Sequence, residues 1–181
     1  MAQTTTWNAN KDLIVGNDLW CYIVDLGHGE SAVPMTYELA TTSAAPIAYA
    51  TSCSLEISAE QLQASSKMSC RWNVSRQGEG SWTVSCDALL CLQSSASANG
   101  AYTVDDLFEA MIQGDNVGVV LAKDSHTDCN SIGGPSTDNV IYWGEAAITS
   151  LSITGGNNEI CSSSISLAGS GQPHKGNDVS S

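Results

Sequence analysis

Residue types that often do chemistry are present in this sequence, but their spacing fits no catalytic or metal-binding pattern. His126 and Cys129 are spaced as two zinc ligands can be, yet no second pair follows, and a zinc site needs about four ligands. His28 lies between two glycines, which is typical of an exposed turn. No serine belongs to a known nucleophile motif, and no phosphate-binding loop is visible. We therefore expect no catalytic residue, no metal and no cofactor, and a protein that is not an enzyme.

The charge balance excludes further classes. The chain has 181 residues, with 19 acidic and 6 basic side chains and a net charge of -13. Such a chain repels phosphate, which argues against a nucleic-acid-binding domain and against binding to anionic membranes. Only 14% of the residues are charged, so much of the surface is uncharged and can be buried against other copies at little desolvation cost.

The cysteines and the chain start point to a reducing compartment. Seven cysteines cannot all pair internally. The first residues lack the basic and apolar regions of a secretory leader, and no apolar run approaches the roughly 18 residues of a membrane span. We expect reduced thiols, cytoplasmic synthesis and no membrane span.

Alternation of apolar and polar residues predicts most of the chain to be β-strand. A strand is expected at 19–25, and Gln77–Gly80 is expected to form a turn. Three strictly alternating runs have as their apolar members Cys53, Leu55 and Ile57, then Met68, Cys70, Trp72 and Val74, then Trp82, Val84 and Cys86. Further strands are expected at 117–121, at 139–154 with a bend near 145–148, and at 161–167.

One amphipathic helix is predicted to begin after Thr103. Thr103 is a good N-cap, Asp106 can complete a capping box, and Gly114 lies where a C-terminal cap belongs. Apolar residues recur at helical spacing and are expected to pack the helix on the sheet: Val104, Leu107, Phe108, Met111 and Ile112. Asp105 and Asp106 point about 100° apart on a helix, so they suit the first turn better than a shared acid–base site.

These elements predict one mainly β domain, a β-sandwich or partly closed barrel with a flanking helix. The boundaries expected are an extended N-terminal arm at 1–12, the domain at 13–170, and a mobile polar tail at 171–181. Residues 26–46 form a long loop excursion, with a short strand expected near 35–39. Trp7 on the arm is a candidate anchor onto a neighbouring subunit, although the arm could equally pack on its own domain.

The order of segments resembles the major tail tube protein of long-tailed (siphovirus-type) bacteriophages. The segments that carry the resemblance are Ile47–Glu60 with Ser65–Lys67, Gly80–Leu90, Thr103–Gly114, Tyr142–Ile153 and Ser164–Gly171. The excursion at 26–46 is longer than in that family.

The resemblance implies a structural virion protein. Six copies would form a ring whose inner sheets join into one barrel, and rings would stack into a tube through which DNA leaves the capsid. The partners implied are further copies, the tape measure, tail terminator and distal tail proteins. DNA would pass without specific binding. The protein would reside in the virion tail after assembly in the host cytoplasm.

A negatively charged channel wall would let DNA slide rather than bind. Glu56, Glu60 and Asp87 lie on the polar phase of their strands and are the candidate lumen acids.

Two other interpretations stay open. The chain could be a related ring component, such as a tail terminator or the tube of an injection system, because a fold does not fix a function. It could also be a β-sandwich that binds carbohydrate through exposed tryptophans, which should be monomeric.

Overall fold

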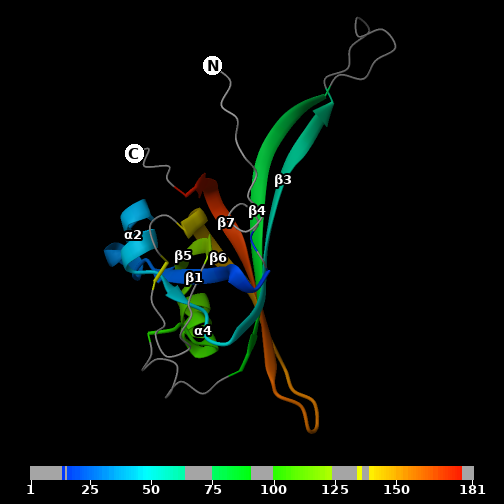
Figure 1. The fold of residues 1–181 in the computed structure, drawn as a ribbon. Helices are drawn as coiled ribbons and strands as arrows, with labels where there is room; N and C mark the ends of the chain where they lie inside the picture. The colour runs from blue at the N-terminus through cyan, green and yellow to red at the C-terminus, as the bar shows by residue number, and fades with distance from the viewer. Residues whose placement is uncertain are drawn as a thin grey trace, which may run out of the picture.

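A computed structural model describes residues 14, 16–63, 75–90, 100–123, 134–135 and 139–176. It shows one seven-stranded antiparallel sheet in the order β2-β1-β5-β6-β7-β4-β3 (Figure 1). The strands are β1 Leu19–Asp25, β2 Ala45–Pro46, β3 Ala50–Gln63, β4 Ser75–Leu89, β5 Asn116–Lys123, β6 Val140–Thr154 and β7 Ser162–Lys175. The helices are η1 Gly16–Asp18, η2 Gly29–Ser31, α2 Tyr37–Thr42 and α4 Val104–Gln113. The predicted mainly β fold with a flanking helix is confirmed.

The layered packing expected of a sandwich arises within this one sheet, which is not closed into a barrel. Cys21 and Ile23 of β1 share a buried cluster with Trp82 and Val84 of β4, although three strands separate β1 from β4 in the sheet. The sheet must therefore bend over itself, as the accumulated twist of long strands allows. Leu107 of α4 fills the same core.

Three thiols meet inside this core. Cys53 lies directly opposite Cys86 in the β3–β4 ladder, and the Cys53 thiol lies 3.4 Å from the carbonyl oxygen of Leu19 on β1. Burial raises the pKa of Cys53 to about 11. A hydrogen bond with Cys86, followed by burial, raises the pKa of Cys21 well above its usual value. The Cys21 and Cys53 thiols therefore stay protonated and serve as small apolar side chains.

The excursion at 26–46 covers the other face of the β1–β5–β6 layer. Met35 and Ala40 join a second buried cluster with Tyr22, Val24 and Trp143. The short strand expected near 35–39 is wrong, because this segment enters helix α2. Thr36 is the N-cap, and its hydroxyl accepts a hydrogen bond from the Leu39 amide, a local alternative that pattern reading did not consider.

The turn expected at Gln77–Gly80 is also wrong, since these residues lie within β4. A β-carbon at Gly78 would lie 3.1 Å from Leu62 Cγ and 3.2 Å from Glu60 Cβ. The ladder shifts register between Ala59 and Gln61 on the facing strand. Close cross-strand approach at a bulge, rather than a turn, therefore favours glycine at this position.

The later strands agree with the predicted pattern except at the chain end. β6 shifts register between Trp143 and Glu145 and again between Ile148 and Ser150, which confirms the predicted bend. β7 continues to Lys175, so the tail expected from residue 171 is strand for its first five residues. There His174 stacks on the buried indole of Trp143 with ring centroids 4.3 Å apart, and this contact holds the strand end in place.

Several predictions fall outside the described residues: the arm at 1–12 with Trp7, the alternating run 68–74 with Trp72, the His126–Cys129 loop, and residues 177–181. The domain boundaries stay predictions. Across the described ranges, no helix combines the length and apolar character needed to cross a bilayer.

Candidate functional site: a polar sheet face with free edges

The outward face of β6, β7, β4 and β3 is the most distinctive surface of the molecule. The inward face of these four strands carries the core, so the alternate residues of each strand point to the outward face. The ladder registers place these outward residues in rows across the four strands: Ser150, Ser152 and Thr154 on β6, Ser162, Ser164, Ser166 and Ala168 on β7, Ser81, Thr83, Ser85 and Asp87 on β4, and Ser52, Ser54, Glu56 and Ser58 on β3. Hydroxyl groups dominate this face, and its charged residues are acids.

Asp87 is held on this face by hydrogen bonds from both neighbouring strands. The Ser52 hydroxyl donates to Asp87 Oδ2 at 2.8 Å from β3, and the Ser164 hydroxyl donates to Asp87 Oδ1 from β7. These bonds, with Ser164 the larger contributor and Ser52 the second, lower the pKa of the Asp87 carboxyl. The group therefore stays ionised on an exposed strand, and no basic side chain of the described residues pairs with it.

The three candidate acids do not form one cluster. Glu56 lies on the same outward face as Asp87, but it pairs with Thr83, four residues along β4 from Asp87. At about 3.3 Å per residue this separation is about 13 Å. Glu60 is exposed at the β3 register shift, beyond the four-strand region. Glu56 and Asp87 are thus separate charges on the same outward face, while Glu60 lies toward the projecting β3–β4 hairpin.

The strands β6, β7, β4 and β3 form a four-strand layer. Among the described residues, this layer ends in unpaired strand edges. β3 pairs with β4 alone. β5 pairs with β6 only as far as Ala147, so Ile148–Thr154 of β6 has β7 as its sole strand partner among the described residues. Free edges expose backbone donors and acceptors that readily pair with another chain. The layer can therefore extend on both sides by addition of strands from further copies.

Helix α4 lies beside this layer, and its cap is as predicted. The Thr103 hydroxyl and the Asp106 carboxylate form a capping box, and Gly114 ends the helix in the left-handed region at φ 75°. The predicted packing holds for Val104 and Leu107, which are buried, but not for the other three residues. Phe108, Met111 and Ile112 are exposed, because the sheet takes only one side of the helix.

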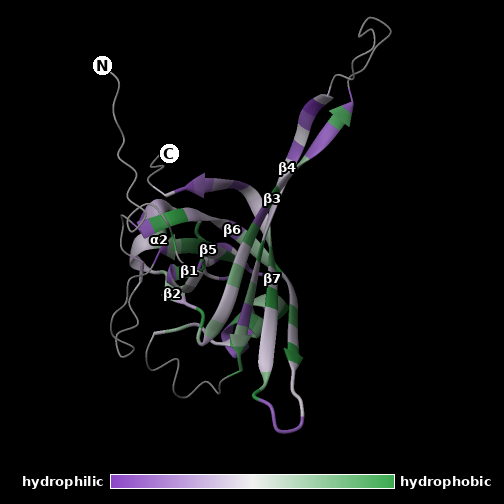
Figure 2. Ribbon diagram, turned by 45° about the vertical axis from the view of Figure 1, so that its right-hand side comes forward, coloured by the Kyte–Doolittle hydropathy of each residue, from purple (hydrophilic) through white to green (hydrophobic). Residues whose placement is uncertain are grey.

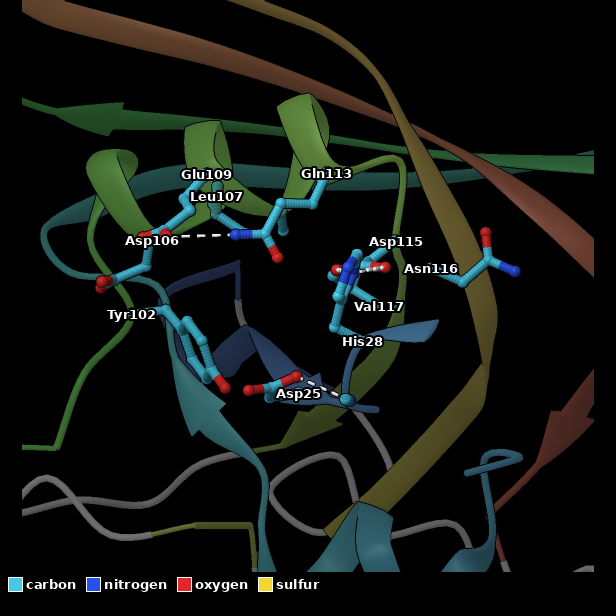
Figure 3. Close-up of a pocket in the computed structure, with 12 residues that line it drawn as sticks. Asp25, His28, Tyr102, Asp106, Leu107, Glu109, Gln113, Asp115, Asn116 and Val117 are labelled. Carbon is cyan, nitrogen blue, oxygen red and sulfur yellow. Dashed lines mark hydrogen bonds and ion pairs between the residues drawn. The ribbon is translucent and has the colours of Figure 1, made fainter. Parts of the chain in front are cut away.

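A pocket of about 300 Å³ lies between α4 and the end of β1. In Figure 3, Glu109 and Gln113 descend from α4, Asp25 and Tyr102 face each other below, and His28 meets Asp115 at the side. The His28 Nδ1 atom lies 2.7 Å from Asp115 Oδ1. Burial, with the nearby Asp25 charge second, raises the pKa of Tyr102 to about 12.

The described lining of this pocket offers no nucleophile beside His28. Its lining holds no serine, threonine, cysteine or lysine that His28 could activate. Among the described residues, no group of three or more His, Cys, Asp or Glu side chains is placed to hold a metal ion. Its acids make the surface beside α4 negative, which favours a cationic partner.

Sequence reasoning missed the pocket and the free edges. The contact between His28 and Asp115 joins residues that are 87 positions apart in the chain, and no local sequence pattern predicts such a pair. The end of β5 pairing at Ala147 is likewise set by the fold.

No protein family model and no curated protein matches this sequence. Solved structures do resemble the fold. A chain from the tail of an empty gene transfer agent (GTA) particle, computed with C6 symmetry, aligns with a TM-score of 0.61 at 17% identity and covers 90% of this chain and 98% of its own. A chain of the SPP1 tail tube aligns with a TM-score of 0.58 at 14% identity and covers 92% of this chain and 82% of its own. A chain from the virion of the native gene transfer agent particle aligns with a TM-score of 0.55 at 13% identity, covering 90% and 98%.

These alignments span at least 90% of this chain. The protein therefore has the fold shared by chains from the gene transfer agent tail, the gene transfer agent virion and the SPP1 tail tube.

Proposed function

We propose that this chain is the structural subunit of a tail tube of the siphovirus type, with a structural rather than a catalytic role. The observation that carries the proposal is the four-strand layer, which combines two free edges with an outward face of hydroxyls and acids. One edge belongs to β3 and the other to Ile148–Thr154 of β6. Pairing β3 of one copy with this part of β6 in the next would consume both edges and close a ring.

Six copies form the proposed ring. The tail of the gene transfer agent particle, which shares the fold, has C6 symmetry. Twenty-four strands spaced about 4.8 Å apart give a backbone circumference of about 115 Å and a diameter of about 37 Å, before strand tilt widens it. Such a channel has room for a DNA duplex inside its side chains.

The polar face would line this channel. Glu56 and Asp87 supply negative charge to the wall, and Glu60 adds charge nearer the hairpin end. No basic residue lies among the outward positions of the layer, so no ion pair would hold the DNA backbone. Because phosphate contacts with lysine and arginine give most of the affinity for DNA, this wall would let DNA pass without binding it.

The proposed location follows from this role. Rings stack into the tail of the virion after assembly in the host cytoplasm, with tape measure, terminator and distal tail proteins as the further partners. The arm at 1–12, with Trp7 as its anchor, would add contacts between neighbouring subunits.

Negative-stain electron microscopy of the purified chain over a concentration series, with light scattering for mass, tests the proposal. Hollow tubes of uniform width and variable length are expected. Single rings that never lengthen would indicate a terminator, and a monomer of 18.9 kDa at every concentration would contradict a tube. Sugar-dependent tryptophan fluorescence of such a monomer would favour the carbohydrate-binding alternative.

A further inference from the structure

Three cysteine thiols gather where the two layers of the folded sheet meet. Cys21 of β1 and Cys86 of β4 belong to the same buried cluster, and Cys53 of β3 packs against it. Cys21 and Cys86 are each 1% exposed, whereas Cys53 is partly exposed at the margin of the cluster. The set therefore combines one thiol that a dissolved reagent can reach with two thiols that are sealed in the core.

Cys53 and Cys86 have the backbone relationship of a cross-strand disulfide. They are directly opposite each other in a part of the β3–β4 ladder where the register is continuous. Directly opposite residues of antiparallel strands have Cα atoms about 4.5 or 5.5 Å apart, and disulfides join Cα atoms about 4.4–6.8 Å apart. Both side chains lie on the inward face of the ladder. The two sulfur atoms can therefore meet by rotation of the side chains, without movement of the backbone.

A bond at this pair would secure the edge strand of the sheet. β3 lies at the end of the strand order and pairs with β4 alone among the described residues. Figure 2 shows these two strands side by side from the body of the molecule to the projecting end. Segments with few packed neighbours open locally before the rest of a fold. A covalent link between β3 and β4 would prevent this opening at the edge that closes the proposed ring.

We propose that Cys53 and Cys86 are a redox modification site, at which a small dissolved disulfide such as glutathione disulfide converts the two thiols into a Cys53–Cys86 disulfide. Structural disulfides form and persist in oxidising surroundings and are rare in the cytosol. The bond would therefore form after the assembled protein leaves the host cytoplasm. That setting rests on the proposed tube function, whereas the thiol chemistry of the subunit does not.

The reaction is a two-step exchange. The deprotonated Cys53 sulfur attacks one sulfur of the small disulfide, whose S–S bond breaks, and the released thiolate takes up a proton. Cys86 then loses its proton and attacks the Cys53 sulfur, and the second small thiol leaves. Two protein thiols lose two electrons and two protons in total, and one small disulfide is reduced to two thiols.

The surroundings of the pair make this exchange slow near neutral pH. Burial, with the neighbouring Cys86 second, raises the pKa of Cys53 to about 11. Because the thiolate is the attacking species, the rate should rise about tenfold for each pH unit below that value. Once formed, the bond would lie against the apolar core, where few dissolved thiols can reach it. The pair should thus stay reduced during assembly and stay oxidised afterwards.

Oxidation of the full unassembled chain tests the proposal. Wild type is incubated with glutathione disulfide at pH 7, 8 and 9, and its peptides are mapped by mass spectrometry without reduction. One linked pair containing Cys53 and Cys86 is expected, with the loss of two hydrogen atoms. Because the bond closes a loop of the unfolded chain, the urea midpoint should rise by about 1–2 M. Dithiothreitol should reverse this rise.

Cysteine variants identify the bond, while the wild-type map stands without them. Cys53→Ala and Cys86→Ala should each abolish the oxidant-dependent rise in the urea midpoint. Cys161→Ala removes a partly exposed thiol next to β7 and is the matched control, which should respond as wild type does. Thiols that stay free at pH 9, a Cys21–Cys86 link, or a glutathione adduct on Cys53 that never resolves would each overturn the proposal. A Cys53–Cys86 bond in a chain that never forms rings would uphold this chemistry and contradict the proposed function instead.

Discussion

The indole ring of Trp82 occupies the space over Gly169, where any β-carbon would collide with it. The Trp82 Nε1–H donates a 2.9 Å hydrogen bond to the Gly171 carbonyl, two residues further along β7. The indole therefore seals the inward side of the β4–β7 ladder at the level where the hairpin leaves the body. Glycine at 169 is a packing requirement, because the ring lies directly against the strand backbone.

Gly169→Ala should consequently destabilise the subunit by about 1–3 kcal/mol, as overpacking of a tight core does. Urea unfolding of the unassembled chain measures the change. Gly80→Ala is the matched control, because a β-carbon there would meet the Ser58 carbonyl oxygen at an ordinary contact distance of 3.8 Å. An equal loss of unfolding free energy in both variants would show that replacing a strand glycine has this effect in general and that the contact with Trp82 is not its cause.

Thr103→Ala should cost about 1 kcal/mol of unfolding free energy, since it removes the hydroxyl of the α4 capping box. Thr103→Ser keeps the hydroxyl and should recover most of that stability. Thermal unfolding with both variants side by side separates the cap from the loss of the buried methyl group. A serine variant as unstable as alanine would assign the effect to packing.

Asp87 should make stability depend on pH in the acid range. Its pKa is lowered in the folded protein by Ser164 and Ser52, so its contribution is present above the ordinary carboxyl pKa and is lost as the pH falls through the lowered value. The stability difference between wild type and Asp87→Asn should therefore be larger at pH 7 than at pH 2–3. The effect should be small, because the carboxylate is exposed. Chemical unfolding at the two pH values measures it, and a difference that grows on acidification would contradict this origin.

A proline scan along β3 should show a two-residue period if its edge closes the ring. Successive amides point alternately to β4 and to the free edge, and proline removes the amide donor. Proline at successive positions from Ser54 to Ser58 should in one phase unfold the subunit and in the other leave it folded but unable to form rings. Circular dichroism and electron microscopy on the same samples distinguish the two outcomes. Folded variants that all form rings would show that β3 is not the joint.

Replacing an acid on the proposed channel wall by lysine should slow the ejection of DNA. Glu56 is exposed on the outward face, so Glu56→Lys introduces a cation there without disturbing the core, and ejection should become slower and more sensitive to salt. Glu38→Lys makes the same charge change on α2, behind the sheet, and serves as the control. Ejection from assembled virions at two salt concentrations is the measurement. Unchanged ejection and salt response with Glu56→Lys would remove Glu56 from the channel wall.

The sequence by itself determined the elements whose signals are local. The α4 cap needs only Thr103, Asp106 and Gly114 in order. The strand at 19–25 needs only a short apolar run, and the strand at 82–86 needs only strict alternation. Local steric and hydrogen-bonding preferences act over a few residues, so they can be read without knowing the fold.

The tertiary structure decided everything that depends on what lies opposite a residue. Glycines at 77–80 look like a turn until Leu62 and Glu60 are seen across the ladder. The helix stripe looks like core until the sheet is found to cover Leu107 and leave Phe108 and Ile112 bare. The free edge of β6 exists because β5 pairing ends at Ala147. Burial and pairing are relations between distant segments, and a local pattern states only that a side chain could take part in them.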